Sequence, residues 1–485
     1  MSNNLSVKNK ALKILADVQT KQKTRNGNSV EKARGDQSSY SDDPEKEQIG
    51  ELLVKLPKLN NIFEVHRKIG EGTFSSVYLA SLRKQSGLAE SQKRWFAIKH
   101  LVPTAHPARV EHELKCLHDM GGRHNVIGVE LCLRQLDTIV FVMPYIPHRK
   151  FAEYVGDMDS HEVALYMQAL LVALKHVHSF GVIHRDVKPS NFLYDRENKR
   201  YLLVDFGLAQ RVVPALPEPP PAHINSSAKR PREEDTESPP GAKRVALDLS
   251  LRPHTCLSMP VSKQIDTLKI NTTLKRNMPK NGASVLTSCA CSNIGGVCAW
   301  CMRRPGARAP RAGTQGFRPP EVLLKSPVQG TAVDTWAAGV MLASLLTARY
   351  PFFRAADDVS ALAELADLLG SAAIQRTAAS LGRRVVLSGS RGGICLRKLA
   401  KRLRRPPIPA PRDTPICPRC TLPQPHCLCL RPQKEHIPDD TEVVAGFPES
   451  AFSLATQLLE PNPRTRLSAE EALKHPFLTN LCSRI

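Results

Sequence analysis

The side chains best suited to chemistry lie in two short motifs near the middle of the chain. Asp186 lies in the first motif, and Asp205 opens the second motif 19 residues later. The motifs read His-Arg-Asp-Val-Lys-Pro-Ser-Asn-Phe-Leu over residues 184–193 and Asp-Phe-Gly over residues 205–207. Aspartate carboxylates bind hard cations such as Mg²⁺, usually together with phosphate oxygens. The two motifs therefore indicate phosphate chemistry at a divalent cation.

Protein kinases carry these two signatures as the catalytic loop and the metal-binding turn, and the chain resembles that family here. The resemblance implies that Asp186 accepts the proton of the substrate hydroxyl group. It also implies that Asn191 and Asp205 hold the Mg²⁺ ions that bridge the ATP phosphates. Lys188, in the pattern Asp-x-Lys-Pro-x-Asn, resembles serine/threonine kinases rather than tyrosine kinases, and Thr314 would then hydrogen-bond to Asp186 and Lys188.

A glycine-rich segment upstream of these motifs is a candidate for binding the ATP phosphates. It follows the pattern G-x-G-x-x-G-x-V, except that Ser75 replaces the third glycine. The first two glycines let the backbone approach the phosphates closely. The candidate residues are Ile69, Gly70, Glu71, Gly72, Thr73, Phe74, Ser75, Ser76 and Val77.

Lys99 and an acidic partner are expected beside the phosphates. Lys99 ends the apolar run Phe-Ala-Ile-Lys, which is typical of the third kinase strand, and it would contact the α- and β-phosphates. The alternative is a surface lysine at the end of a strand. Glu113 lies 14 residues later in a segment with helical apolar spacing, and we expect it to pair with Lys99. Glu111 is the competing choice.

The link between two lobes is predicted at residues 143–146. An apolar strand over residues 138–142 leads into Met143, which would line the adenine pocket. Tyr145 and Ile146 would offer backbone hydrogen bonds, whereas Pro144 cannot donate one. The end of an ordinary buried strand would have the same residue types.

Three further segments would position these groups. Residues 160–179 have apolar side chains on one face of a predicted helix, which leads to the catalytic loop. Asp334 precedes an apolar helix and would orient the catalytic loop from below. Glu321 would pair with Arg466 near the end of the chain, with Arg464 as the less favoured partner.

Two basic segments interrupt this pattern. Glu321 lies 114 residues beyond Gly207, and the Pro-rich, Lys/Arg-rich composition between them predicts a mostly disordered insertion over residues 211–308. Its basic runs at 229–232 and 243–244 resemble a two-part nuclear import signal, although a solvated basic run has the same composition. A second basic insertion is predicted over residues 371–438.

Each insertion also contains four closely spaced cysteines. Tetrahedral zinc suits such sets in a reducing compartment, and free thiols are the alternative. The first set is Cys289, Cys291, Cys298 and Cys301; the second is Cys417, Cys420, Cys427 and Cys429, with His426 as a spare ligand. The two sets could also share a metal.

Charge and composition limit the class of protein. The net charge is +22, and residues 208–310 and 371–438 contribute +8 and +12 of it, so the remainder is close to neutral. The 13 cysteines come without a secretory signal, and the longest apolar stretch, residues 336–347, is too short to span a bilayer. We therefore expect an intracellular protein with reduced thiols and no membrane partner.

These patterns predict an α+β bilobal protein kinase fold, with a small β-rich N-lobe and a larger helical C-lobe, interrupted by long basic insertions. We expect a disordered tail over residues 1–60 and a kinase domain over residues 61–480. Within that domain the N-lobe would span residues 61–142, the hinge residues 143–146 and the C-lobe residues 147–480.

Within the protein kinases the chain resembles the cell-division-cycle-seven kinases, the catalytic subunits of the kinase that triggers replication origins. The matching segments are residues 97–103, 186–194, 204–210, 309–314, 316–318 and 349–352. The resemblance implies a nuclear serine/threonine kinase that uses ATP and Mg²⁺ and depends on an activating regulatory subunit. Its substrates would be acidic tails of the replicative minichromosome-maintenance helicase, which would link it to DNA replication and the cell cycle.

Arg311 and Arg318 flank Thr314, and they suggest how an acidic substrate would be recognised. Guanidinium groups suit a carboxylate or phosphate placed just after the target residue. A structural role is the alternative for Arg318. Two other functions are considered: a self-sufficient kinase of another nuclear pathway, and a pseudokinase scaffold whose basic insertions bind nucleic acid.

Overall fold

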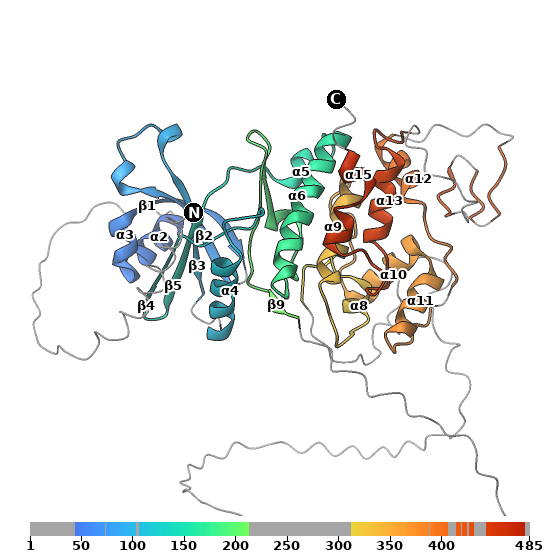
Figure 1. Ribbon diagram of the computed structural model, residues 1–485, viewed down its shortest axis with the longest axis horizontal. Coiled ribbons are helices and arrows are strands. Elements are labelled where there is room, and N and C mark those ends of the chain that lie inside the picture. The colour runs from blue at the N-terminus through green and yellow to red at the C-terminus, as the bar shows by residue number, and fades with distance from the viewer. Residues whose placement is uncertain are drawn as a thin grey trace, which may run out of the picture. The chain divides into compact units, whose positions relative to one another are not determined.

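The computed structural model describes residues 44–72, 74–102, 106–212, 312–387, 389–405, 414–418, 420–423, 426–430 and 443–480. These residues fall within one compact unit. A five-stranded sheet forms one lobe and a group of helices forms the other (Figure 1). The predicted α+β bilobal fold is therefore confirmed.

The N-lobe sheet is antiparallel, with the strand order β1-β2-β3-β5-β4. Alternate residues of a strand face opposite sides. Phe141 and Met143 accordingly join the main core, whereas Val140 and Val142 pack on the other face of the sheet. The strands are β1 (Phe63–Gly72), β2 (Ser75–Leu82), β3 (Trp95–Leu101), β4 (Leu131–Gln135) and β5 (Thr138–Pro144), with 3-10 turns at Arg83–Gln85 and Glu90–Gln92.

Two helices upstream of β1 cover the outer face of this sheet. Helices α2 (Pro44–Lys55) and α3 (Pro57–Ile62) bury Ile49, Leu52, Leu56 and Leu59 against that face. The prediction of a disordered tail over residues 1–60 is therefore wrong for residues 44–60, and residues 1–43 lie outside the described residues. The four buried residues recur at helical spacing, but the charged residues between them hid this pattern.

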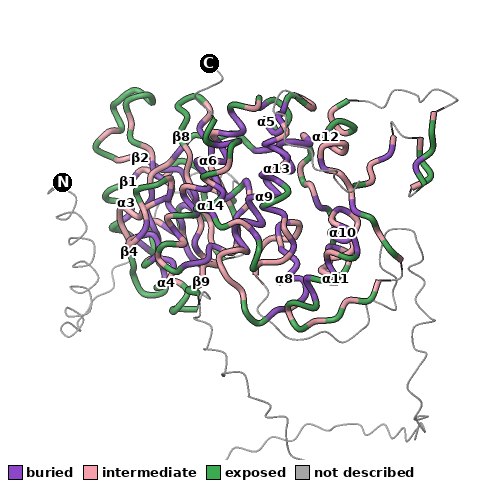
Figure 2. Tube along the Cα trace, turned by 45° about the vertical axis from the view of Figure 1, so that its right-hand side comes forward, coloured by how far each residue is buried: buried purple, intermediate pink, exposed green. Residues whose placement is uncertain are grey.

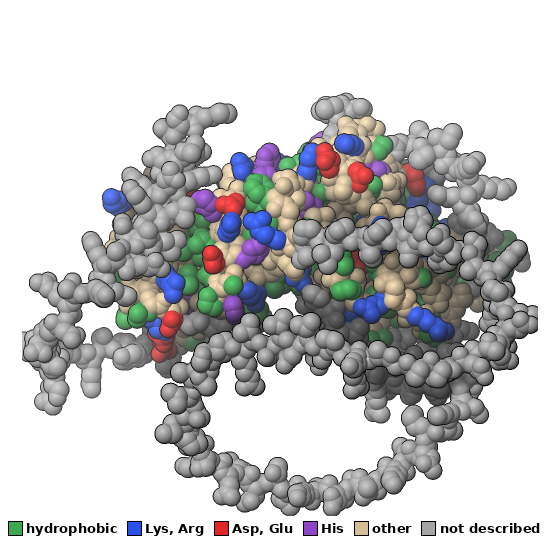
Figure 3. Space-filling view, turned by 60° about the horizontal axis from the view of Figure 1, so that its bottom comes forward, with side chains coloured by type: hydrophobic (Ala, Val, Ile, Leu, Met, Phe, Trp, Pro, Cys, Tyr) green, Lys and Arg blue, Asp and Glu red, His purple; other side chains and the backbone are tan. Residues whose placement is uncertain are grey.

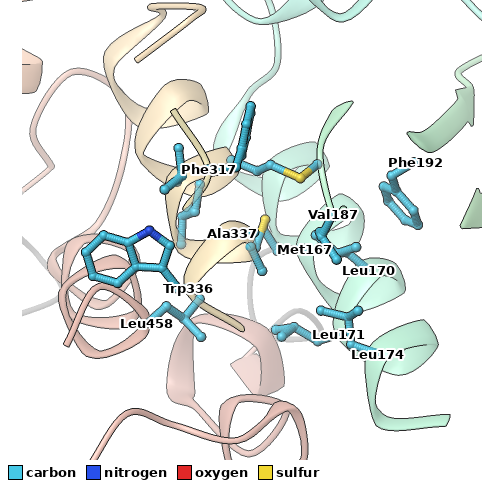
Figure 4. Packing of buried hydrophobic residues seen from close by; sticks show 14 of the residues in the cluster. Met167, Leu170, Leu171, Leu174, Val187, Phe192, Phe317, Trp336, Ala337 and Leu458 are labelled. Carbon is cyan, nitrogen blue, oxygen red and sulfur yellow. The ribbon is translucent and has the colours of Figure 1, made fainter. Parts of the chain in front are cut away.

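The C-lobe is built around helices α6 (Ser160–Ser179) and α9 (Ala332–Thr347), whose apolar side chains form the centre of the main core. Figure 4 shows Met167 and Leu170 of α6 beside Ala337 of α9 and Val187 of the catalytic loop. Asp159 caps α6 by accepting a hydrogen bond from the Glu162 backbone N–H at 2.7 Å. Buried residues follow α6, α9 and α13 (Figure 2).

The remaining elements surround this core. The helices are α4 (Pro107–Asp119), α5 (Phe151–Tyr154), α8 (Pro320–Leu323), α10 (Asp358–Leu369), α13 (Glu449–Leu458), α14 (Ala469–Ala472) and α15 (Pro476–Thr479). Two small sheets pair β6 (Val182–Ile183) with β9 (Gln210–Arg211) and β7 (Phe192–Asp195) with β8 (Arg200–Leu203), and a 3-10 turn spans Pro189–Asn191. These two small sheets hold the catalytic loop and the Asp-Phe-Gly motif next to each other.

The start of the second predicted insertion folds onto the C-lobe. Helix α11 (Ser371–Ser380) buries Ile374 and Ala378, and helix α12 (Leu396–Arg404) buries Ala400. α11 contacts α8, and α12 contacts α9. Residues 371–405 are therefore part of the lobe rather than a separate insertion.

Several predictions concern residues outside the described ranges. They include the insertion beyond residue 212, with its basic runs and first cysteine set, and the candidate residues Thr73 and Arg311. On the face in Figure 3, the Lys and Arg side chains of the described residues lie in several separate places, and some of them adjoin acidic or histidine side chains. None of the helices in the described parts of the chain is long and apolar enough to cross a membrane.

Candidate active site

Lys99 lies at the centre of a buried charge cluster. Its Nζ is 2.5 Å from Glu113 Oε1 on α4 and 2.8 Å from Asp205 Oδ1. Burial by itself would lower the pKa of Lys99, but the two carboxylates outweigh burial and raise the pKa. Lys99 is therefore a fixed cation. Glu113, rather than Glu111, is its partner, as predicted.

Asp186 is held by the side chains of Thr314, Lys188 and Asn191. Thr314 donates its Oγ1 hydrogen to Asp186 Oδ1 at 2.7 Å, and its backbone N–H donates to the same oxygen at 3.0 Å. Lys188 Nζ lies 2.9 Å from Asp186 Oδ2 and donates to Thr314 Oγ1 at 2.8 Å. The predicted contacts of Thr314 with Asp186 and Lys188 are present. Gly313 is required here, because a Cβ on it would lie 2.8 Å from the Arg185 carbonyl oxygen.

Asn191 and Asp205 offer oxygen atoms suited to a hard cation. Asn191 Nδ2 donates to the Asp186 carbonyl oxygen and to Asp186 Oδ2, both at 2.9 Å, which orients its Oδ1 away from Asp186. Asp205 uses Oδ1 for Lys99 and for the Gly207 N–H at 3.2 Å, so Oδ2 is the oxygen it presents. Burial by itself would raise the pKa of Asp205, but Lys99, the Gly207 N–H and His184 together outweigh burial and lower the pKa, which keeps Asp205 ionised. One carboxylate oxygen and one amide oxygen fit Mg²⁺ bound together with phosphates.

The catalytic loop is anchored by Asp334, which is buried at the start of α9. Its carboxylate accepts hydrogen bonds from the His184 and Arg185 backbone N–H groups, both at 2.8 Å. His178 Nε2 lies 2.9 Å from Asp334 Oδ2. Asp334 thus orients the loop as predicted. The ring of Phe206 packs against the ring of His184, with 4.9 Å between the ring centroids, and this contact joins the two motifs.

Comparison with known proteins agrees with this geometry. Residues 63–220 and 298–478 match the protein kinase domain family. The chain is 36% identical to the non-specific serine/threonine protein kinase Cdc7 of Drosophila melanogaster, over 90% of this chain and 77% of that protein. It is 35% identical to the Cell division cycle 7-related protein kinase of Homo sapiens, over 90% of this chain and 93% of that protein. It is 29% identical to the Cell cycle serine/threonine-protein kinase hsk1 of Schizosaccharomyces pombe, over 90% of this chain and 76% of that protein.

The chain belongs to the Cdc7 family of protein kinases. It is an ATP-dependent serine/threonine protein kinase. The fixed Lys99 and the ordered Asp186 are consistent with that activity, because phosphoryl transfer depends mostly on positioning and on stabilising charge.

The glycine-rich loop of this Cdc7-family kinase is the hairpin between β1 and β2. Ser75, the departure from the glycine pattern, is a strand residue that pairs with Gly72 and with Leu101. It is not among the described residues with a positive φ, so the position does not need glycine. Phe74 lies at the tip, with 47% of its surface exposed.

The hinge differs from the prediction in two respects. Strand β5 extends through Pro144, so Met143 and Pro144 still pair with β3, and the hinge starts two residues later than expected. The Tyr145 backbone N–H donates to the Trp95 carbonyl oxygen at 3.1 Å, so it is not available to adenine. Among the predicted hinge donors, Ile146 is the one that the sheet does not use.

Two arginines differ in how far they match the predictions. Arg466 Nη1 and Nη2 contact Glu321 Oε1 and Oε2 at 2.8 and 2.9 Å in a buried pair, as expected. Arg318 is not a free cation beside the substrate. It donates to the Gly313 carbonyl oxygen at 3.0 Å and to Asp358 Oδ1 at 2.8 Å. The structural alternative for Arg318 is therefore the one observed.

The second cysteine set converges at one point. The Sγ atoms of Cys417, Cys420, Cys427 and Cys429 all lie within 4.8 Å of one another. His426, considered as a spare ligand, is not part of this group. The described cysteines form no disulfide. Four convergent thiols are a donor set suited to tetrahedral zinc.

Sequence reasoning missed the contacts that hold this cysteine set against the C-lobe. The Cys395 N–H donates to the Leu428 carbonyl oxygen at 2.8 Å, and the Leu430 N–H donates to the Gly393 carbonyl oxygen at 3.1 Å. Lys398 of α12 donates to the Cys429 carbonyl oxygen at 3.3 Å. The apolar spacing of residues 396, 399, 400 and 403 was the available signal, and the surrounding basic residues obscured it.

Proposed function

We propose that this Cdc7-family kinase phosphorylates serine and threonine residues in acidic protein segments in the nucleus, and thereby helps to initiate DNA replication and S phase. The observation that carries the catalytic part is the ordered environment of Asp186, because Thr314, Lys188 and Asn191 all reach its carboxylate. A base fixed in this way is suited to accept the proton of an incoming hydroxyl group.

Most of the predicted site residues keep their expected roles in this proposal, with the Tyr145 N–H and Arg318 as exceptions. Lys99 contacts the α- and β-phosphates of ATP, and Lys188 stabilises charge beside Asp186. Asn191 and Asp205 hold Mg²⁺, which neutralises phosphate charge when bound. Met143 and the Ile146 N–H face the adenine. The loop residues 69–77 cover the phosphates, and the protein thereby positions ATP for in-line attack.

The acidic preference is assigned to Arg311, because Arg318 is engaged with Asp358 and Gly313. The test compares phosphorylation of a Ser-Asp peptide with that of its Ser-Ala counterpart. Arg311→Ala is expected to reduce the preference for Ser-Asp about tenfold, the size expected from losing a charge-assisted contact. Arg318→Lys serves as the matched control. An unchanged preference in Arg311→Ala would contradict the assignment.

Dependence on a regulatory subunit, with the replicative helicase as substrate, is proposed from the resemblance to cell-division-cycle-seven kinases. The test measures phosphoryl transfer by the purified full chain alone, with Mg²⁺-ATP binding followed in parallel and Asp186→Asn as control. Bound ATP without transfer would support a missing activator. Transfer that Asp186→Asn removes would favour a self-sufficient kinase. A chain that binds no ATP would favour the pseudokinase alternative.

We also propose structural zinc at Cys417, Cys420, Cys427 and Cys429. The convergence of the four thiols supports it. Cys427→Ser is expected to lower the zinc content by about one ion per chain, measured by atomic emission on the purified protein. Cys395→Ser is the matched control, because Cys395 is a neighbouring cysteine outside the group. Equal zinc content in both variants would exclude the site.

A further inference from the structure

Arg109 makes two contacts with the active site that the family motifs do not explain. It lies in the first turn of α4, which begins at Pro107. Its guanidinium carbon is 4.5 Å from the centroid of the Phe74 ring, at the tip of the glycine-rich loop. Its Nη2 donates to the Gly207 carbonyl oxygen at 2.9 Å. One side chain therefore links the loop tip, α4 and the metal-binding turn.

The contact of Arg109 with Gly207 lies one helical turn from the ion pair between Lys99 and Glu113. Arg109 and Glu113 are four residues apart on α4, so they share one face of the helix. Glu113 holds Lys99, which in turn contacts Asp205, and Arg109 holds the Gly207 carbonyl oxygen. A Cβ on Gly207 would lie 3.4 Å from Glu113 Oε2, which shows how closely α4 approaches the turn. The helix is thus attached to both ends of the Asp-Phe-Gly turn.

The contact of Arg109 with the Phe74 ring acts on the glycine-rich loop. Phe74 is about half exposed, and the Phe74 carbonyl oxygen accepts a hydrogen bond from the Val102 N–H at 3.0 Å. Among the described residues, Phe74 belongs to none of the hydrophobic clusters, so its ring is not part of a described core. A guanidinium group over the face of an aromatic ring is an attractive contact, and arginine stacks better than lysine.

We infer that Arg109 is a positioning residue that holds the tip of the glycine-rich loop closed over the ATP phosphates and holds α4 on the metal-binding turn. The inference rests on the ATP site proposed for this kinase. It assigns two separable effects to one side chain. The contact with Phe74 affects the affinity for phosphates, and the contact with Gly207 affects turnover.

The experiment uses the full chain and compares Mg²⁺-ATP with adenosine, which has no phosphates. Arg109→Ala and Phe74→Ala are each expected to weaken ATP binding about threefold to fivefold, the size of an exposed cation–π contact, and to leave adenosine binding unchanged. The double variant is expected to lose no more than either single variant, because the two residues act through one contact. Lys115→Ala, an exposed change on the same helix, is the matched control.

Turnover separates the two effects. In preparations with measurable phosphoryl transfer, Phe74→Ala is expected to raise the KM for ATP alone, whereas Arg109→Ala also lowers kcat. Arg109→Lys keeps the charge without the planar fork and is expected to recover part of the ATP affinity. It also serves if Arg109→Ala does not fold.

Three results would overturn the inference. They are unchanged ATP binding in Arg109→Ala, equal weakening of ATP and adenosine, and additive losses in the double variant. If the unmodified chain bound adenosine but not ATP, the phosphate site and this inference would fail together. An unmodified chain with normal ATP binding and an unaffected Arg109→Ala would overturn the inference alone.

Discussion

The catalytic centre and the helices docked around it use charged residues in different ways. In the centre, charges meet charges of opposite sign: Lys99 meets Glu113 and Asp205, and Lys188 meets Asp186. On α12, Arg397 pairs with Glu449, but Lys398, Arg402 and Arg404 instead donate to backbone carbonyl oxygens. Arg404 donates to the Leu345 and Leu346 carbonyl oxygens at 2.5 and 2.8 Å. Chemistry therefore needs particular residue types at fixed positions, whereas docking needs only a long cation near a helix end.

This difference also bears on the basic charge of the chain. The basic residues in 371–405 are candidates for nucleic-acid binding by their charge, but several have contacts within the lobe. Arg383 donates to the Lys325 carbonyl oxygen, Arg391 pairs with Asp367, and Arg397 pairs with Glu449. The carboxylates offset the charge of Arg391 and Arg397, whereas the carbonyl contact orients Arg383 and leaves its charge in place. These contacts give Arg383, Arg391 and Arg397 structural roles within the lobe.

The largest effect is expected in the catalytic centre. Asp186→Asn should lower phosphoryl transfer by about 10²- to 10⁴-fold, because the amide cannot accept the hydroxyl proton. The thermal unfolding midpoint should change little, since the amide keeps the shape of the carboxylate. Transfer is measured on a serine peptide under conditions in which the unmodified chain is active. Asp137→Asn, an exposed change in the turn between β4 and β5, is the control. Retained transfer in Asp186→Asn would mean that Asp186 is not the catalytic base, and that the centre does not depend on its particular residue types.

The next effect concerns α2, which carries no chemistry. Leu52→Ala should lower the free energy of unfolding by about 2–5 kcal/mol, because Leu52 is 1% exposed and packs against the sheet. Val54→Ala, on a residue that is 79% exposed, should change it by less than about 0.5 kcal/mol. Urea unfolding measures both variants. Equal values would mean that α2 contributes nothing to the stability of the lobe.

The smallest effect is expected on α12. Arg404→Ala should lower the free energy of unfolding by about 1–3 kcal/mol, because it removes the donors to two carbonyl oxygens at the end of α9. The neighbouring Arg405 is exposed, and Arg405→Ala should be close to neutral. The two variants are compared by urea unfolding with zinc present in excess. A larger loss from Arg405→Ala would mean that the charge of α12, rather than its contacts, stabilises the lobe.

The sequence predicted the centre well because its geometry is local. Asp186 and Asn191 lie on one loop. Glu113 was preferred to Glu111 because Glu-Leu-x-x-Leu is the usual kinase context, in agreement with the ion pair observed. The distant partners Thr314 and Arg466 were found only because they recur in a family pattern. Spacing alone does not bring residues more than a hundred positions apart together.

Other features were not predictable from such patterns. Helix α2 was missed because its apolar residues are few and lie among charged ones. The Tyr145 N–H was assigned to adenine because a sequence does not show which strand residue takes a backbone donor. Arg318 could be recognised as structural only once Asp358 was seen beside it.

The two helices before β1 have a practical consequence for where this kinase can be cut. The match to the kinase family begins at Phe63, after both helices. A fragment starting there would uncover Phe96, Ile98, Val140 and Val142, which α2 and α3 cover in the whole chain. An apolar sheet face opened to water favours self-association. The smallest soluble fragment of this kinase should therefore start before Pro44, even though the family pattern starts 19 residues later.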